Sequence, residues 1–176
     1  MEMNPQEFDE YLRQSEPHRS ERAQSWKTAI GLQAVDGLKP SSYLLETARR
    51  HIEGDISIEE VKSLIDSYYQ TQTSHTQDSA MTEEADKVSA NIAELLNEKT
   101  FTFSPMGYIS IHRRIFNGVF KFAGSLRDYN ISKKEWVLRG DTVLYTSAAE
   151  LRMTLDYDFA QEARFDYRTL SPSEMI

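Results

Sequence analysis

The chain has 176 residues, no cysteine and a formal net charge of −8, from 28 acidic and 20 basic residues. This length suits one ordinary domain, or a small domain with a helical appendage, and the lack of cysteine excludes disulfides, thiolate catalysis and thiolate-bound zinc. The acidic balance disfavours nonspecific binding to nucleic acid.

The sequence predicts neither a signal peptide at the N-terminus nor a membrane helix. The N-terminus has no basic segment followed by an apolar one, and no apolar run approaches the ~20 residues of a membrane helix. We therefore expect a soluble, cytoplasmic protein with no membrane and no nucleic-acid partner.

Residues 1–69 predict a block of short helices with narrow apolar stripes. Asp36-Gly37 and Gly54 are typical helix ends, and Ser57 with Glu60 forms a capping-box pattern. Such a block buries little surface by itself, so we expect it to pack against the rest of the chain. The predicted helices are Pro5–Leu12, one from Ser20 to Asp36-Gly37, one from Ser41 or Ser42 through Ile52, and one from Ser57 through Tyr68.

Residues 70–81 are almost wholly small and polar, which predicts a linker. The second block, 82–176, begins with a helix from Thr82 to Leu96 and continues with a helix from Pro105 to Val119. Alternating apolar residues between Lys134 and Tyr145 predict a β-hairpin, and Ser147 to Glu150 again has the spacing of a capping box. The predicted fold class is mainly α with one hairpin.

Several motifs in the second block occur together at a specific spacing. They are Ile111–Phe116, Phe122-Ala-Gly124, Arg127 and Asn130-Ile-Ser-Lys133. This series resembles the front half of the core of Fic-family proteins, which transfer AMP from ATP to protein hydroxyls. The resemblance implies a helical Fic-like core fragment whose hairpin is the family's flap.

The resemblance also implies a nucleotide site at the base of the flap. ATP and Mg²⁺ are the cofactors of the intact family, and the flap aligns an extended segment of the target protein by strand addition. From the residues alone, Arg127 equally fits a packing role or an ion pair with Asp128, Lys133 and Lys134 fit a solvated pair, and Asn130 fits a turn. The implied cofactor-binding residues are Arg127, Ile131, Ser132, Lys133 and Lys134.

Residues 1–69 resemble the small VbhA-like antitoxins that inhibit one class of Fic proteins. In these antitoxins an inhibitory helix carries Ser/Thr-x-x-x-Glu-Gly, and the positions that match here are Leu32, Asp36 and Gly37. Leu32 cannot donate a hydroxyl hydrogen bond, and Asp36 is one methylene shorter than Glu. The degenerate motif leaves two readings open, inhibition of a Fic protein and structural support.

The Fic signature, His-x-Phe-x-Asp/Glu-Gly-Asn, follows none of the four histidines. We therefore predict no catalytic residue and no metal ligand in this sequence, and we read His112 as a histidine at the edge of the core. Ser171 and Pro172 have the pattern of a helix start close to Ile176, which is typical of a truncated frame. The expected function is that of a Fic relative that is inactive alone; the alternative is a non-catalytic antitoxin or interaction module that binds a separate Fic protein.

Overall fold

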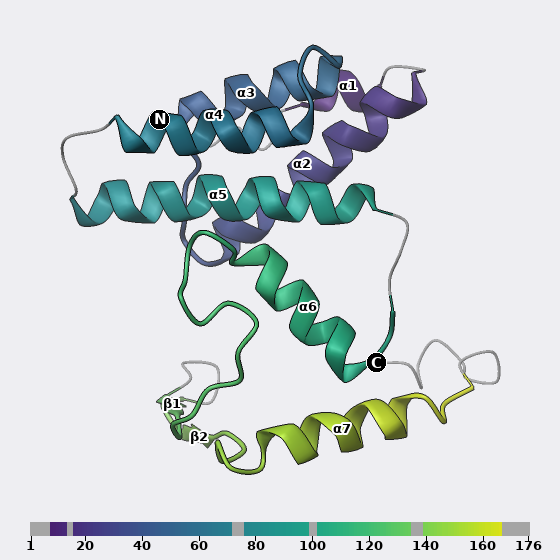
Figure 1. The fold of residues 1–176 in the computed structure, drawn as a ribbon, viewed down its shortest axis with the longest axis vertical. Helices are drawn as coiled ribbons and strands as arrows, with labels where there is room; N and C mark the ends of the chain where they lie inside the picture. The colour runs from purple at the N-terminus through teal and green to yellow at the C-terminus, as the bar shows by residue number, and fades with distance from the viewer. Residues whose placement is uncertain (1–7, 14–15, 72–75, 99–101, 135–138, 167–176) are drawn as a thin grey trace. The chain divides into compact units, whose positions relative to one another are not determined.

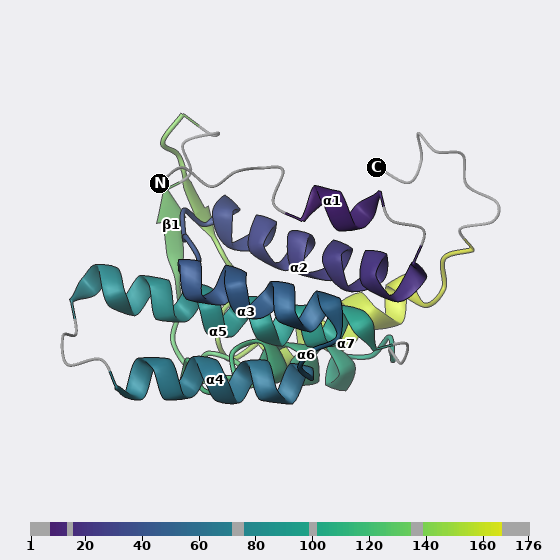
Figure 2. The same ribbon diagram turned by 90° about the horizontal axis from the view of Figure 1, so that it is seen from above.

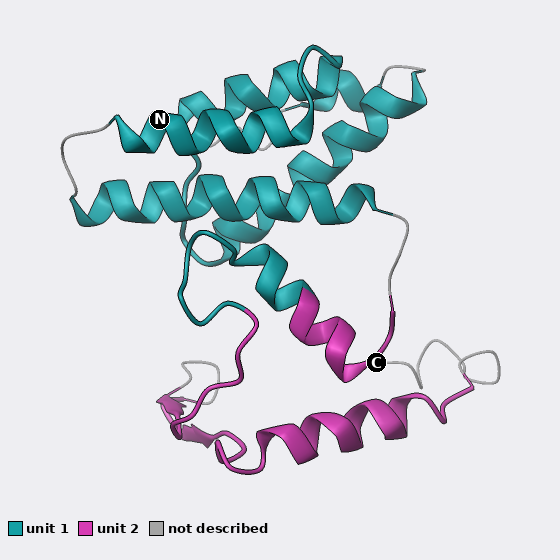
Figure 3. Ribbon diagram, in the orientation of Figure 1, with its two compact units in different colours: residues 1–101, 111–123 teal, residues 102–110, 124–176 magenta. Residues whose placement is uncertain are grey.

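The structure is a computed structural model that describes residues 8–13, 16–71, 76–98, 102–134 and 139–166. This part of the chain is mainly helical with one small antiparallel sheet, as predicted. It divides into two compact units, residues 1–101 with 111–123 and residues 102–110 with 124–176 (Figure 3). The elements are α1 (Asp9–Leu12), α2 (Pro17–Val35), α3 (Ser42–Glu53), α4 (Ile58–Gln70), α5 (Gln77–Asn97), α6 (Pro105–Ile115), β1 (Ser132–Lys134), β2 (Thr142–Leu144) and α7 (Leu151–Glu162).

The first unit is a bundle in which α2 and α5 form the main contact. Helix α2 also packs against α1 and α3, and α4 packs against α3 and α5 (Figures 1 and 2). Because α5 lies in the second sequence block, the expected packing of the first block against later residues is confirmed. The fully buried members of the core include Ala23, Trp26, Leu44, Ala48, Ile52, Val61 and Ala93.

Helix ends in the first unit follow local sequence signals. Ser57 and Glu60 form the predicted capping box, with bonds of 2.7 and 3.2 Å in the two directions. Ser41 caps α3 by accepting the Leu44 amide at 3.0 Å. Gly54 follows α3 with a φ of 90°, a conformation that glycine adopts without steric cost.

Two helices begin earlier than predicted. Helix α5 begins at Gln77 rather than Thr82, because the Thr76 side chain caps it by accepting the Ser79 amide at 3.2 Å. Residues 77–81, which we assigned to the linker, are therefore helical. Their polar composition reflects a solvent-exposed first turn, which needs no apolar period. Helix α2 begins at Pro17 rather than Ser20, with proline in the first turn.

Two other predicted boundaries were wrong. Helix α6 ends at Ile115 rather than Val119, and Asn117-Gly118 lies outside it, Gly118 having a φ of 77°. Ser147 and Glu150 form no capping box, because the Ser147 hydroxyl donates to the Glu150 carboxylate at 2.6 Å and no side chain caps α7. The predicted helix start at Ser171 lies outside the described residues.

A buried carboxylate connects three helices of the first unit. The Asp86 side chain, fully buried in α5, accepts hydrogen bonds from the Ser41 amide at 2.8 Å, the Ser41 hydroxyl at 2.6 Å and the Tyr69 hydroxyl at 2.7 Å. Burial raises the pKa of Asp86, and the bonds from Ser41 and Tyr69 oppose that shift. Burial and the nearby Asp86 also raise the pKa of Tyr69.

A second buried polar contact links α2 with α3. The Trp26 indole donates to Nδ1 of His51 at 3.0 Å, and the Arg22 guanidinium donates to the His51 carbonyl at 3.0 Å. Burial, and then the positive charge of Arg22, lower the pKa of His51 to about 4. His51 is therefore neutral at pH 7, which its role as acceptor requires.

Among the described residues of the second unit, Ile109 is the buried one. Strands β1 and β2 pair antiparallel, with Lys133 opposite Val143, and the described turn residues Arg139 and Gly140 both have positive φ. Helix α7 has no buried residue, and its Phe159 ring packs against Phe103 at 4.7 Å between centroids. The predicted hairpin is thus confirmed, with β1 beginning two residues earlier than expected.

Within the described ranges, no helix is long and apolar enough to cross a membrane.

Replacement of Asp86 by alanine tests the buried carboxylate. We expect Asp86→Ala to lower the free energy of unfolding by about 3 kcal/mol, because Ser41 and Tyr69 lose a buried acceptor. Asp66→Ala is the matched control: it removes a half-exposed partner of Lys87 at 3.1 Å and should cost less than about 1 kcal/mol. Urea unfolding followed by circular dichroism measures both, and equal losses would contradict the assigned role.

The pH dependence of stability tests the Trp26–His51 contact. The folded pKa of His51 is about 4 and its ordinary value is 6.5, so between these pH values the unfolded chain binds a proton that the folded chain does not. The contribution of His51 is complete above pH 6.5 and falls by about 3 kcal/mol as the pH drops to 4. His51→Gln should flatten this part of the pH profile of the unfolding free energy, whereas the exposed His18→Gln should leave it unchanged.

Candidate functional site

The residues predicted to bind a nucleotide lie in and next to the hairpin of the second unit. Ile131, Ser132, Lys133 and Lys134 are all exposed. Successive residues of a strand point to opposite faces, so Lys133 and Lys134 lie on opposite sides of β1. Nucleotide binding by these residues stays a prediction.

Arg127 is bonded to the backbone at the base of the hairpin. Its guanidinium donates to the carbonyl of Tyr129 at 2.6 Å and to the carbonyl of Thr146. The sequence predicts that Asn130 holds a local turn through its side chain; instead its side-chain oxygen accepts the amide of Ala148, 18 residues later, at 2.8 Å. Arg127 and Asn130 thus connect the chain before β1 to the chain after β2, and contact between Arg127 and a phosphate stays a prediction.

The degenerate antitoxin motif lies at the C-terminal end of α2 in the first unit. Asp36 is the C-cap residue of α2, and Gly37 follows with a φ of 75°. Nothing lies within 4 Å of the place where a Cβ would be at Gly37, so this glycine is required by the backbone conformation and not by space. Asp36-Gly37 ends the helix as predicted.

Leu32 and Asp36 line an open apolar groove of about 450 Å³, which we call the α2–α5 groove. Its other walls come from α5, through Val88 and Ile92, and from the end of α6, through Ile115. The side of the groove formed by α2 is exposed, since Leu32 is 50% and Val35 83% accessible. The sequence motif identified two of its residues, but the α5 wall carried no motif that could have found it.

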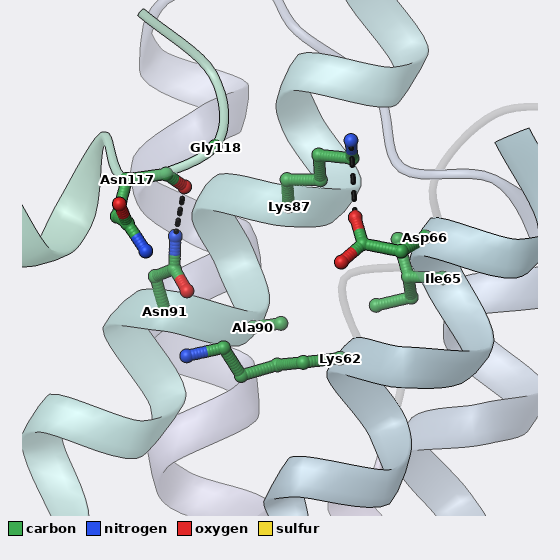
Figure 4. Close-up of a pocket in the computed structure, with 8 residues that line it drawn as sticks. All are labelled: Lys62, Ile65, Asp66, Lys87, Ala90, Asn91, Asn117 and Gly118. Carbon is green, nitrogen blue, oxygen red and sulfur yellow. Dashed lines mark hydrogen bonds and ion pairs between the residues drawn. The ribbon is translucent and has the colours of Figure 1, made fainter. Parts of the chain in front are cut away.

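A second pocket in the first unit is small and polar. It has a volume of about 80 Å³ and lies between α4, α5 and the turn at Asn117 and Gly118 (Figure 4). Its two lysines are already paired with acids, Lys62 with Glu94 at 3.0 Å and Lys87 with Asp66 at 3.1 Å. This pairing leaves little positive potential for an anion.

The Asn91 side chain beside this pocket fixes the end of α6. Its amide donates to the carbonyls of Ile115 at 2.9 Å and Asn117 at 3.2 Å, satisfying acceptors that a helix end leaves free. The residues around the small pocket thus serve the architecture of the first unit.

His112 and Arg114 make contacts with other side chains of the first unit. The Arg114 guanidinium pairs with the Glu98 carboxylate, as expected for a surface arginine. His112 packs against the Phe116 ring at 5.0 Å between centroids, which agrees with its reading as a histidine at the edge of the core. In the part of the chain that the structure describes, no group of three His, Asp or Glu residues could hold a metal ion.

Comparison with known proteins gives no relative for this chain: no family model, no curated protein and no solved structure matches it. The resemblance to Fic proteins therefore depends on the sequence motifs alone and stays a prediction.

Substitution of Arg127 tests its role at the base of the hairpin. Arg127→Lys should make the β1–β2 hairpin open more often. A lysine ammonium group cannot donate to both carbonyls at once in the way that the planar guanidinium does. We expect hydrogen exchange at the amides of residues 132–134 and 142–144 to accelerate about tenfold. Arg152→Ala removes an exposed pair with Asp156 in α7 of the same unit and should leave these amides unchanged. Unaltered exchange in Arg127→Lys would show that the hairpin does not depend on this side chain.

Proposed function

We propose that this chain is a Fic-family relative that acts as a non-catalytic binding module of the antitoxin type. Leu32 and Asp36 are the two positions at which this chain departs from the antitoxin motif. The observation that carries the proposal is that both residues line the α2–α5 groove. A residue needed only for packing would be covered, whereas Leu32 is half exposed beside an apolar depression. The motif thus coincides with a surface suited to a protein partner.

The two departures from the antitoxin motif suit an apolar interface. Leu32 replaces a hydroxyl residue, so it contributes buried apolar area where the family has a hydrogen bond. Asp36 keeps the negative charge on a shorter side chain at the end of α2. On this proposal the partner is a separate Fic protein, held mainly by apolar contact.

A second candidate function concerns the hairpin. Arg127 and Asn130 fix the base of β1 and β2, and this bracing supports a role as the flap that aligns an extended protein segment. Transfer of AMP would in addition need ATP and Mg²⁺, and the sequence has no His-x-Phe-x-Asp/Glu-Gly-Asn loop to act on them. We therefore place AMP transfer outside the activity of these 176 residues.

Co-expression with a Fic protein that has a complete signature loop tests the proposal. We expect the two chains to co-purify, and AMP transfer from labelled ATP by the Fic protein to fall when this chain is added. Leu32→Glu should weaken both effects at least about tenfold, because it places a charge in an apolar contact. Leu96→Glu is the matched control, since Leu96 is also 50% exposed but does not line the groove.

Two results would contradict the proposal. One is AMP transfer that is unchanged by the chain, together with no co-purification. The other is labelling of proteins by this chain alone in the presence of ATP and Mg²⁺, which would show an activity that the sequence does not predict.

A further inference from the structure

The walls of the α2–α5 groove have the spacing of helical ridges. On α5, Glu84, Val88 and Ile92 are four residues apart and therefore lie along one side of the helix. On α2, Leu32 is followed by Val35 and Asp36 three and four residues later. Val88 and Ile92 are only 2% and 8% exposed, whereas Leu32 and Val35 are 50% and 83% exposed. The α2 row therefore supplies the ridge against which a third helix can pack.

The groove offers apolar side chains and no free sheet edge. Its lining residues belong to α2, α5, the end of α6 and the chain next to those helices. An extended segment would find no backbone partners in it, whereas a helix satisfies its own backbone groups and needs only an apolar face. The shape and chemistry of the groove therefore favour a helix over a strand.

The charge of the groove is negative. Asp36 and Glu84 line it, and none of its lining residues is a lysine or an arginine. Asp36 also lies at the C-terminal end of α2, where the helix dipole adds a partial negative charge. A cation placed beside the apolar face of an incoming helix would be attracted by all three.

Two other acids of α5 are already paired with lysines. Glu83 pairs with Lys87 at 2.8 Å, and Glu94 pairs with Lys62 at 3.0 Å. Among the ion pairs of the described residues, neither Asp36 nor Glu84 takes part. Glu83 and Glu94 are thus neutralised within the chain, whereas no ion pair of the described residues includes the two carboxylates that line the groove.

We propose that the α2–α5 groove binds a basic amphipathic helix of a partner protein, with its apolar face against the exposed Leu32 and Val35 and the partly buried Ile115, and a lysine or arginine beside Asp36 and Glu84. This inference rests on the proposed function only in taking the groove as a protein-binding surface. It defines the chemistry of the partner: an apolar stripe flanked by positive charge. An acidic helix of the same shape is rejected by the two carboxylates.

Two synthetic helices of about 18 residues test the proposal, a length at which an isolated helix can form. Both have the same leucine stripe; one has lysines and the other glutamates beside it. Fluorescence anisotropy with the full chain should show the lysine peptide binding at least about tenfold more tightly, with an affinity that falls as salt is added. Equal binding of the two peptides, or no binding of the lysine peptide, would overturn the proposal.

Variants of the chain locate the binding and separate it from general attraction to an acidic protein. Asp36→Asn with Glu84→Gln should weaken the lysine peptide about fivefold. Glu21→Gln with Asp55→Asn removes the same charge from exposed positions outside the groove and should change the affinity by less than about twofold. Leu32→Glu should abolish binding while Leu96→Glu retains it, and the reverse result would place the peptide elsewhere.

The peptide assay tests the inference about the groove, and the Fic co-expression assay tests the proposed function, so either can be contradicted without the other. Binding of the lysine peptide in the groove, with no effect of the chain on a Fic protein, would overturn the proposed function and leave this inference standing. If the chain inhibits a Fic protein through Leu32 but binds the two peptides equally, the proposed function stands and this inference is overturned.

Discussion

A single buried carboxylate, that of Asp86, holds the N-terminus of α3, the last turn of α4 and the middle of α5 together. Ser41 both caps α3 and donates two hydrogen bonds to Asp86, so the start of α3 is fixed against α5 at 2.6–2.8 Å. Ser41 lies five positions after Asp36, and Asp86 lies two positions after Glu84. The contact that stabilises the bundle therefore also limits how far the two walls of the α2–α5 groove can move apart.

The distribution of charge around α5 determines which partners the α2–α5 groove can accept. Lys62 forms an ion pair with an acid of α5, and Lys87 forms ion pairs with acids of α4 and α5. The chain as a whole carries a net charge of −8. Local pairing therefore removes positive charge from the surface near α5 and leaves Asp36 and Glu84 beside an apolar depression. Apolar area supplies most of the affinity of such a surface, and the unpaired acids decide which partners it accepts.

Local signals predicted the fold well, and nonlocal contacts explain most of what was missed. The capping box at Ser57 and the glycine end at Gly54 involve neighbouring residues, so the sequence alone shows them. The bond between Trp26 and His51 spans 25 positions, and the bonds between Ser41 and Asp86 span 45, which no periodicity reveals.

The same limit applies to the candidate site. The motif located Leu32 and Asp36 at the end of α2, but Glu84 and Val88 line the same groove from a helix about 50 residues later. At the hairpin, the sequence showed that Arg127 is a cation but not that two carbonyls accept its hydrogen bonds.

The end of α2 shows how a structural and a binding role can be separated at one motif. The role of Asp36 and Gly37 in ending α2 accounts for this pair of residues, because Asp36 is the C-cap and Gly37 adopts the left-handed conformation. Nothing about ending a helix, however, requires the preceding turn to present apolar side chains to solvent. Leu32 and Val35 do so at 50% and 83% exposure, although α2 buries Trp26 and Ile30 on its other side. Exposed apolar surface carries a cost in water, and the helix would be as stable with polar residues at both positions. The part of the motif that helix geometry leaves unexplained is thus the part that a partner would cover.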